Sequence, residues 1–170
     1  MIAVQTLQLS TIALANAVLK YGFEHGIPVT PMKLQRLLYL IYATCLQETG
    51  QKLFDERFQC WKYGAVLDSV YNKFACYRAK TITAYAPDAA GFVHILDVLS
   101  HPGLAHAFAR VMSEFAECSP TVLSDVTRAN GSAWEKAVQN GHGWLQGTDI
   151  MADPCTRMRP GTNPADGTSA

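Results

Sequence analysis

The segment from Thr30 to Gly50 constrains the fold of this 170-residue chain more than any other stretch. Thr30 is a candidate N-cap, and Pro31 stands at the first helical position, where its missing N–H is not needed for a hydrogen bond. Apolar residues then recur at helical spacing in two stripes, and Gly50 ends the pattern. Because a helix that is apolar on most of its circumference is buried, we expect a central helix with one core built around it.

Further helix signals lie on both sides of this central segment. We expect helices over about 10–23, 68–77 and 103–118, followed by two short helices capped by Ser119 and by Ser132. Ser132 and Glu135 have the spacing of a capping box, in which each side chain accepts from the other residue's backbone N–H. Residues 86–101 fit a loop followed by either a strand or a helix. The predicted class is a single compact domain that is mainly α.

A small antiparallel β element is expected to interrupt the helices, which makes the fold class α+β. Residues 54–61 alternate as a half-buried strand does, with Phe54 and Phe58 on the inner face. Residues 81–85 are β-branched and aromatic, and we expect them to pair with this strand. Gly64 permits a sharp turn after Trp61, and we expect the Trp61 ring to pack against the central helix. We interpret Phe54, Phe58, Trp61, Gly64 and Trp134 as structural residues.

Composition divides the chain into a domain over residues 1–150 and a C-terminal tail over 151–170. The tail contains three prolines, two glycines and few bulky apolar residues, so it is expected to be flexible. The apolar N-terminus has no Lys or Arg before its apolar run and is interrupted by Gln5, Gln8 and Asn16, so it does not resemble a signal peptide. With no run of about 18 apolar residues, we expect no membrane contact and a cytoplasmic location.

Charge and cysteine usage argue against several functions. Lys and Arg total 14, as do Asp and Glu, and this balance makes general nucleic-acid binding a poor fit. The five cysteines have irregular spacing without a C-x-x-C motif, and His94, His101 and His106 do not fit a zinc pattern. We therefore expect no metal, no cofactor and no catalytic residue. A nucleophilic pair of Cys60 or Cys118 with a histidine is the enzymatic alternative, as in a Cys–His hydrolase.

One region is locally basic and is interleaved with aromatic residues. Its members are Lys33, Arg36, Lys62, Lys73, Arg78 and Lys80, together with Tyr39, Tyr42, Trp61, Tyr63, Tyr71 and Tyr77. Such a surface fits single-stranded nucleic acid, but Trp, Tyr and Arg also concentrate binding energy at protein interfaces. The zero net charge favours a protein partner. We expect that partner to contact Lys33, Arg36, Lys62 and Tyr63.

The segment "MKLQRLLYLIYATCLQETGQKLFDERFQCWKYGAVLDSVYNKF" resembles the SocA-like, or Panacea, domain of antitoxins and phage-associated proteins. The family pattern of a K-L-Q-K-L-L-Y helix, an LF-x-E-x-F-x-A-W strand and a G-P-V turn is matched from Lys33 to Val66. The later segment "LSDVTRANGSAWEKA" resembles the family's L-S-x-L-T-H…W pattern, and the likeness spans about residues 10–145. Ala65 stands where the family usually has Pro, and Arg128 stands where it usually has His, so a partner contact at position 128 would differ here.

The resemblance implies a role without catalysis. Members of the family look like antitoxins that neutralise a cognate protein toxin by direct binding. One branch acts as an adaptor that delivers its toxin to the ClpXP protease, and other members are phage-associated proteins. The expected partners are therefore a cognate toxin or another protein, and the ClpXP protease, with partner contacts extending to Arg128. The sequence leaves open whether the chain forms a homodimer and whether the module instead binds nucleic acid.

Overall fold

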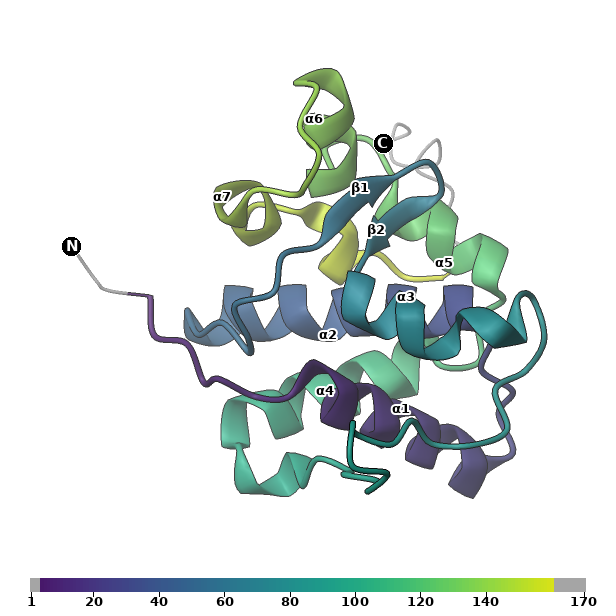
Figure 1. Ribbon diagram of the computed structural model, residues 1–170. Helices are drawn as coiled ribbons and strands as arrows, with labels where there is room; N and C mark the ends of the chain where they lie inside the picture. The colour runs from purple at the N-terminus through teal and green to yellow at the C-terminus, as the bar shows by residue number, and fades with distance from the viewer. Residues whose placement is uncertain (1–3, 161–170) are drawn as a thin grey trace.

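Helix α2 (Pro31–Thr49) lies at the centre of the computed structural model, which describes residues 4–160. Helices α1 (Thr11–His25) and α4 (Pro102–Phe115) pack along one side of it. A two-stranded ribbon and α5 (Pro120–Thr127) lie on the other side, as Figure 1 shows, and α3 (Asp68–Phe74) packs against both α1 and α2. The arrangement confirms the expected class, a mainly helical domain with a small antiparallel β element.

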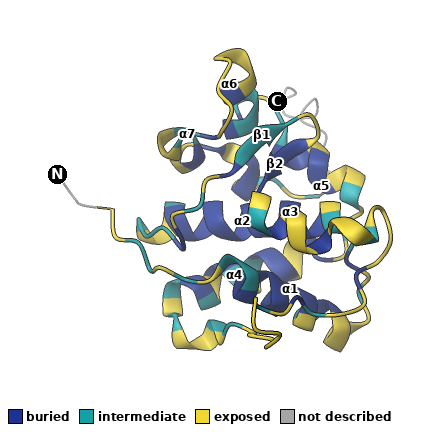
Figure 2. Cartoon of the chain, in the orientation of Figure 1, coloured by how far each residue is buried: buried dark blue, intermediate teal, exposed yellow. Residues whose placement is uncertain are grey.

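The ends of α2 follow the local rules read from the sequence. Thr30 Oγ1 accepts a hydrogen bond from Lys33 N at 3.3 Å, and Pro31 is the first helical residue. Gly50 ends the helix with φ of 71°, a left-handed conformation that glycine adopts without steric cost. Between these ends α2 is buried on nearly its whole circumference from residue 33 to residue 46, as the dark blue ribbon in Figure 2 shows. The prediction of a central helix is confirmed.

The β ribbon joins different segments from those expected. Strand β1 (Gln59–Trp61) pairs with β2 (Gly64–Val66), with Trp61 opposite Gly64. Residues 81–85 form no strand, so their predicted pairing is wrong. Ile82 in that segment is buried, and its N–H donates to the carbonyl oxygen of Val29 at 2.8 Å. Ile82 is the one buried residue of this segment and packs near the loop before α2, while Thr81, Thr83 and Ala84 are exposed.

The short helices near the C-terminus begin at the predicted caps. Ser119 Oγ accepts from Val122 N before α5, and Ser132 Oγ accepts from Glu135 N before α6 (Ala133–Gln139). The reciprocal half of the capping box is absent among the described contacts. The Glu135 carboxylate instead accepts from Gln139 Nε2, while Ser132 N donates to the carbonyl of Ala129. The chain that precedes Ser132 therefore satisfies the backbone donor that the glutamate was expected to satisfy.

The long connection between α3 and α4 contains two short 3-10 helices, η1 (Ala75–Tyr77) and η2 (Val98–Ser100). Asn16 of α1 is fully buried and holds this connection by its side-chain amide. Its Oδ1 accepts from Ala86 N, and its Nδ2 donates to the carbonyl oxygens of Ala86 and His94, each at 2.9 Å. One amide thus satisfies buried backbone groups of a segment that has little regular structure of its own.

The segment after Ile150 is packed against the domain, which corrects the expectation of a flexible tail from residue 151. Helix α7 (Gly147–Met151) leads into a 3-10 helix, η3 (Pro154–Arg157), and both pack against α2. Between them Asp153 is 2% exposed, and its carboxylate accepts from Tyr39 Oη, Ala133 N and Cys155 N. These bonds order the segment despite its prolines, so the packed domain extends past residue 150. Residues 161–170 of the expected tail lie outside the described part.

Within residues 4–160, no helix combines the length and the apolar character needed to cross a membrane.

Candidate partner-binding groove

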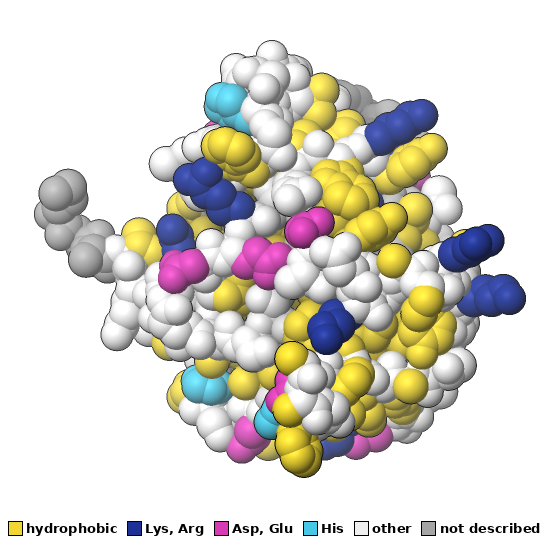
Figure 3. Space-filling model, in the orientation of Figure 1, with side chains coloured by type: hydrophobic (Ala, Val, Ile, Leu, Met, Phe, Trp, Pro, Cys, Tyr) yellow, Lys and Arg dark blue, Asp and Glu magenta, His cyan; other side chains and the backbone are white. Residues whose placement is uncertain are grey.

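An open cavity of about 390 Å³ lies between the first turns of α2, the β ribbon and α3. We call it the groove. Hydrophobic side chains gather on the face over the β ribbon and α3, with Lys and Arg at the edge of that face, as Figure 3 shows. The groove is lined by Pro31, Met32, Gln35, Arg36, Trp61, Lys62, Tyr63, Val66, Val70, Tyr71, Phe74 and Arg78.

Aromatic rings form much of the groove's accessible wall. Tyr63 is 55% exposed and Tyr71 is 44% exposed, which is high for side chains of this size. The half-buried Trp61 packs edge-on against Tyr71, with the ring centroids 4.7 Å apart. Trp61 was expected to be a core residue packed against α2, and its burial is overestimated: the ring is half-buried, contacts Tyr71 of α3 and lines the groove together with residues of α2. Its indole N–H donates to Gln59 Oε1, and its carbonyl accepts from Trp134 Nε1 at 2.7 Å.

Arg36 connects α2 to the ribbon beneath the groove. Its Nη1 donates to the carbonyl of Ala65 at 2.6 Å, its Nη2 donates to the carbonyl of Tyr63, and its Nε donates to Ser124 Oγ at 3.2 Å. The side chain is 2% exposed, so the prediction of a freely accessible contact residue is wrong, although Arg36 does line the groove. Burial, together with the nearby charge of Arg128, lowers the pKa of Arg36 to about 10.

Gly64 lies where the ribbon approaches this guanidinium group. It is the first residue of β2 and has φ of 134°, which L side chains rarely adopt. The sharp turn that the sequence predicts after Trp61 is confirmed: the chain reverses over Lys62 and Tyr63, and Gly64 begins the second strand. Ala65, which replaces the proline usual in the family pattern, lies opposite Cys60 in the ribbon. A residue with a backbone N–H is therefore compatible with this position.

Two side chains that match the family motif, but to which the sequence analysis assigned no role, fix the link from β2 to α3. Gln35 Oε1 accepts from Leu67 N at 2.9 Å, and Gln35 Nε2 donates to the carbonyl of Leu67 at 3.1 Å. The Glu56 carboxylate accepts from the N–H and the hydroxyl of Ser69 in the first turn of α3. A carboxylate at a helix N-terminus complements the orphan N–H groups and the helix dipole. These contacts hold α3, and with it Val70 and Tyr71, as the wall of the groove.

The structure separates the other residues predicted to contact a partner. Lys62 and Tyr63 both line the groove, and Lys62 Nζ lies 5.4 Å from the Tyr63 ring centroid. Lys33 is 4% exposed and faces a different cavity, beside Cys118, where burial lowers its pKa. Arg128 packs over the Trp134 ring and donates to the carbonyl of Ser124. Lys33 and Arg128 therefore do not join Lys62 and Tyr63 in one surface.

Phe54 and Phe58 occupy the core as expected, where both rings pack against Tyr42 of α2. The sequence missed Met32, Val66 and Val70 as groove residues because each fits the pattern of an ordinary core position. Tyr71 and Arg78 belonged to the basic and aromatic region noted in the sequence. The position of Tyr71 on the predicted helix, with Arg78 soon after it, was the sequence signal that could have identified this wall of the groove.

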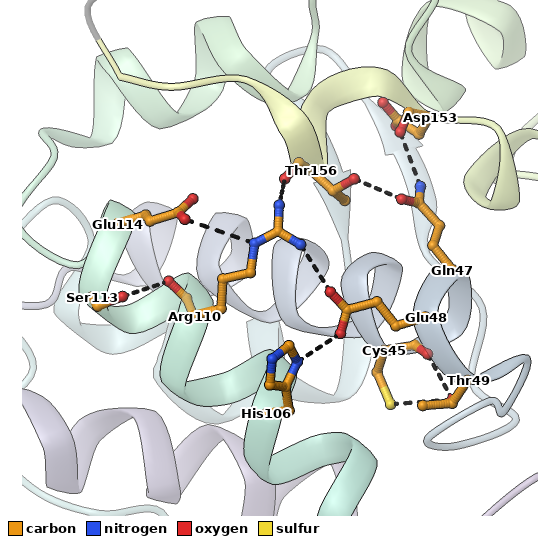
Figure 4. A network of polar contacts seen from close by, with 10 residues as sticks. All are labelled: Cys45, Gln47, Glu48, Thr49, His106, Arg110, Ser113, Glu114, Asp153 and Thr156. Atoms are coloured by element: carbon orange, nitrogen blue, oxygen red, sulfur yellow. Dashed lines mark hydrogen bonds and ion pairs between the residues drawn. The ribbon is translucent and has the colours of Figure 1, made fainter.

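The cysteines and histidines are not brought together into a site in the part of the chain described. Burial raises the pKa of Cys45, Cys60, Cys118 and Cys155, which disfavours the nucleophilic thiolate. No cysteine within residues 4–160 hydrogen-bonds a histidine, and no three His, Cys, Asp or Glu residues there cluster as metal ligands. His106 instead contacts Glu48, which also pairs with Arg110 at 2.8 Å (Figure 4).

Comparisons with known proteins agree with this arrangement. A family model described as antitoxin SocA-like, Panacea domain matches residues 34–97, which run from α2 across the ribbon and α3 into the following connection. The chain is also 30% identical over 138 residues to Antitoxin SocA of Caulobacter vibrioides (strain NA1000 / CB15N), a match that covers 77% of this chain and 71% of that protein. No solved structure matches it significantly. The chain therefore belongs to the antitoxin SocA-like, Panacea domain family.

Proposed function

We propose that this protein is an antitoxin that neutralises a cognate protein toxin by direct binding, without catalysis, and that the groove is its contact surface. Membership of the family supports an antitoxin role. The observation that carries the choice of surface is the open apolar groove, in which Tyr63 and Tyr71 are exposed beside the cation of Lys62. Large aromatic side chains of this kind provide most of the binding energy at protein interfaces.

The mechanism we propose is occlusion of the toxin's active surface. The groove itself would seat a few anchoring side chains, and the surrounding surface would complete an interface of roughly 1,600 Å² in total. Its framework is rigid, because buried hydrogen bonds from Arg36 and Gln35 hold the ribbon and the start of α3. A preformed site loses little conformational entropy on binding, which favours affinity.

We extend the proposal to delivery of the bound toxin to the ClpXP protease in the cytoplasm. The support for this step is the family resemblance, since one branch of the family works as an adaptor. The test is the half-life of an epitope-tagged toxin in cells with and without the antitoxin and with and without ClpX. Delivery predicts that the toxin's half-life shortens only when both are present. An unchanged half-life would limit the protein to neutralisation by occlusion.

The reading frames beside this gene provide the decisive experiment. We expect one of them to encode a small protein that arrests growth when expressed alone and is tolerated when this chain is co-expressed. Isothermal titration of the two purified proteins should then show direct binding. If neither neighbouring protein is toxic, or if a toxic one does not bind, the proposed function is wrong.

A pair of double variants tests the surface. Lys62→Ala with Tyr63→Ala removes two exposed groove side chains and should abolish both protection and binding. Lys20→Ala with Leu99→Ala is the matched control, because these residues are also one cation and one exposed apolar side chain, but they line a different cavity. Both double variants should melt within a few degrees of the wild type. Full protection by the groove variant would show that the toxin binds elsewhere.

A further inference from the structure

The charged residues that line the groove are all basic. Arg36, Lys62 and Arg78 are among the residues that line it, and no Asp or Glu is. None of the ion pairs found within residues 4–160 includes any of these three cations. Across the chain acidic and basic residues balance at 14 each, so the groove is a local departure from neutrality.

Arg36 is the most important of these three cations because its charge is buried without a counter-ion. A guanidinium group has five N–H donors, and three of them donate to Ala65, Tyr63 and Ser124. The other two have no acceptor among residues 4–160, and Arg128 adds a repulsive charge nearby. A buried cation is costly unless an anion compensates it. An anion that enters the groove would provide this compensation.

We propose that the groove receives a protein segment with an apolar anchor and at least one carboxylate, that the carboxylate pairs with the exposed cations of Lys62 and Arg78, and that it lies close enough to the buried guanidinium of Arg36 to compensate its charge. The inference rests on the proposed function and specifies the chemistry of the toxin segment that is bound. The anchor packs against the adjoining rings of Trp61 and Tyr71, which both line the groove. A carboxylate is the anion of matching geometry, since the guanidinium fork pairs with it through two parallel hydrogen bonds.

The walls favour a protein segment over single-stranded nucleic acid. Four aromatic residues line the groove, Trp61, Tyr63, Tyr71 and Phe74, but Met32, Val66 and Val70 interrupt them with aliphatic surface that offers no stacking platform. Nucleic-acid channels combine stacked aromatic rings with a basic track that follows many phosphates. Here the cations lie at one apolar hollow, which suits one or two carboxylates beside a hydrophobic anchor.

Defined peptides and the full-length protein provide the test. The first probe is a fluorescein-labelled decapeptide with a Leu-Trp-Leu core flanked by glutamates, and the second replaces every glutamate with glutamine. A labelled ten-nucleotide oligothymidylate is the third probe. Fluorescence anisotropy should show that the glutamate peptide binds about tenfold more tightly than the glutamine peptide. Its affinity should also fall as salt is added, because mobile ions screen charge pairs.

Charge-reversal variants locate the effect. Lys62→Glu with Arg78→Glu changes two exposed side chains and should remove or invert the preference for the glutamate peptide. Lys20→Glu, outside the groove, should keep the preference. In the wild-type protein, the NMR resonance of the Arg36 Nε–H group should shift when the glutamate peptide is added and not when the glutamine peptide is added.

Three outcomes would overturn the inference: equal affinity for the two peptides, no measurable binding of the glutamate peptide, or tighter binding of the oligothymidylate. These outcomes are distinguishable from failure of the proposed function. If the toxin still binds and Lys62→Ala with Tyr63→Ala still abolishes that binding, the proposed function stands and only the carboxylate is wrong.

Discussion

The guanidinium group of Arg36 lies so close to Gly64 that no other residue fits there without displacement. A Cβ atom added to Gly64 would lie 2.5 Å from Cζ of Arg36 and 2.8 Å from both Nε and Nη2. Real Cβ atoms essentially never make heavy-atom contacts below 3.0 Å. Helix α2 and the ribbon are therefore joined where a buried side chain meets a residue without one, and this junction sets the position of the groove.

Gly64→Ala should destabilise the fold by about 3 kcal/mol, since it combines an unfavourable φ with displacement of Arg36 from its carbonyl acceptors. Urea denaturation followed by circular dichroism would measure the loss. Gly141→Ala is the matched control, because Gly141 also has a positive φ, 66°, but has nothing within 4 Å of an added Cβ. That variant should lose about 1 kcal/mol. Equal losses for the two variants would show that the contact with Arg36 does not matter.

Phe58→Ala and Trp61→Ala should separate the core from the groove. Phe58 is buried against Tyr39 and Tyr42, so its truncation should cost about 3–5 kcal/mol of unfolding free energy. Trp61 is half-buried and loses mainly its edge contact with Tyr71, so we expect a loss of about 1–2 kcal/mol. Urea denaturation checks both values. A loss for Trp61→Ala as large as that for Phe58→Ala would mean that its ring is part of the core after all.

Local rules were sufficient for the helices. The helix caps at Thr30, Ser119 and Ser132 could be predicted from the sequence because each depends on residues within three positions of the cap. The burial of α2 followed from its own apolar periodicity. Phe54 and Phe58 are buried as predicted, but the strand expected over 54–61 is limited to Gln59–Trp61, so the alternation indicated their burial and not their secondary structure.

Long-range contacts explain what the sequence did not reveal. Lys33 and Arg36 are charged and lie on the predicted helix, so a solvent-exposed position was the natural expectation. Arg36 is buried because the carbonyls it meets come from Tyr63 and Ala65, about thirty residues later in the chain. The segment after Ile150, which was expected to be a flexible tail, is likewise ordered by a long-range contact. Its Asp153 accepts a hydrogen bond from Tyr39, 114 positions away. No pattern within either segment encodes such a partner.

Asp153→Ala should destabilise the protein strongly although it lies in a segment whose composition suggests disorder. The substitution leaves the buried Tyr39 hydroxyl and the backbone N–H groups of Ala133 and Cys155 without their acceptor. We expect a loss of about 3 kcal/mol, measured by urea denaturation. Asp149→Ala, four residues earlier and only partly buried, serves as the control and should lose less than about 1 kcal/mol. If Asp153→Ala were as stable as this control, the packed C-terminal segment would contribute little to the fold.

Tyr42→Phe should change how stability depends on alkaline pH. Burial, followed by the charges of Asp55 and Cys45, raises the pKa of Tyr42 from 10.0 to about 12. Because the folded value lies above the unfolded one, the protonated hydroxyl contributes stability below pH 10 that is lost as the pH rises toward 12. Phenylalanine has no such proton, so the unfolding free energy of the wild type should fall by about 2–3 kcal/mol more than that of the variant across this window. Urea denaturation at several pH values measures both curves, and effects of other titrating groups cancel in their difference. Parallel curves would mean that the Tyr42 hydroxyl ionises as readily in the folded protein as in the unfolded chain.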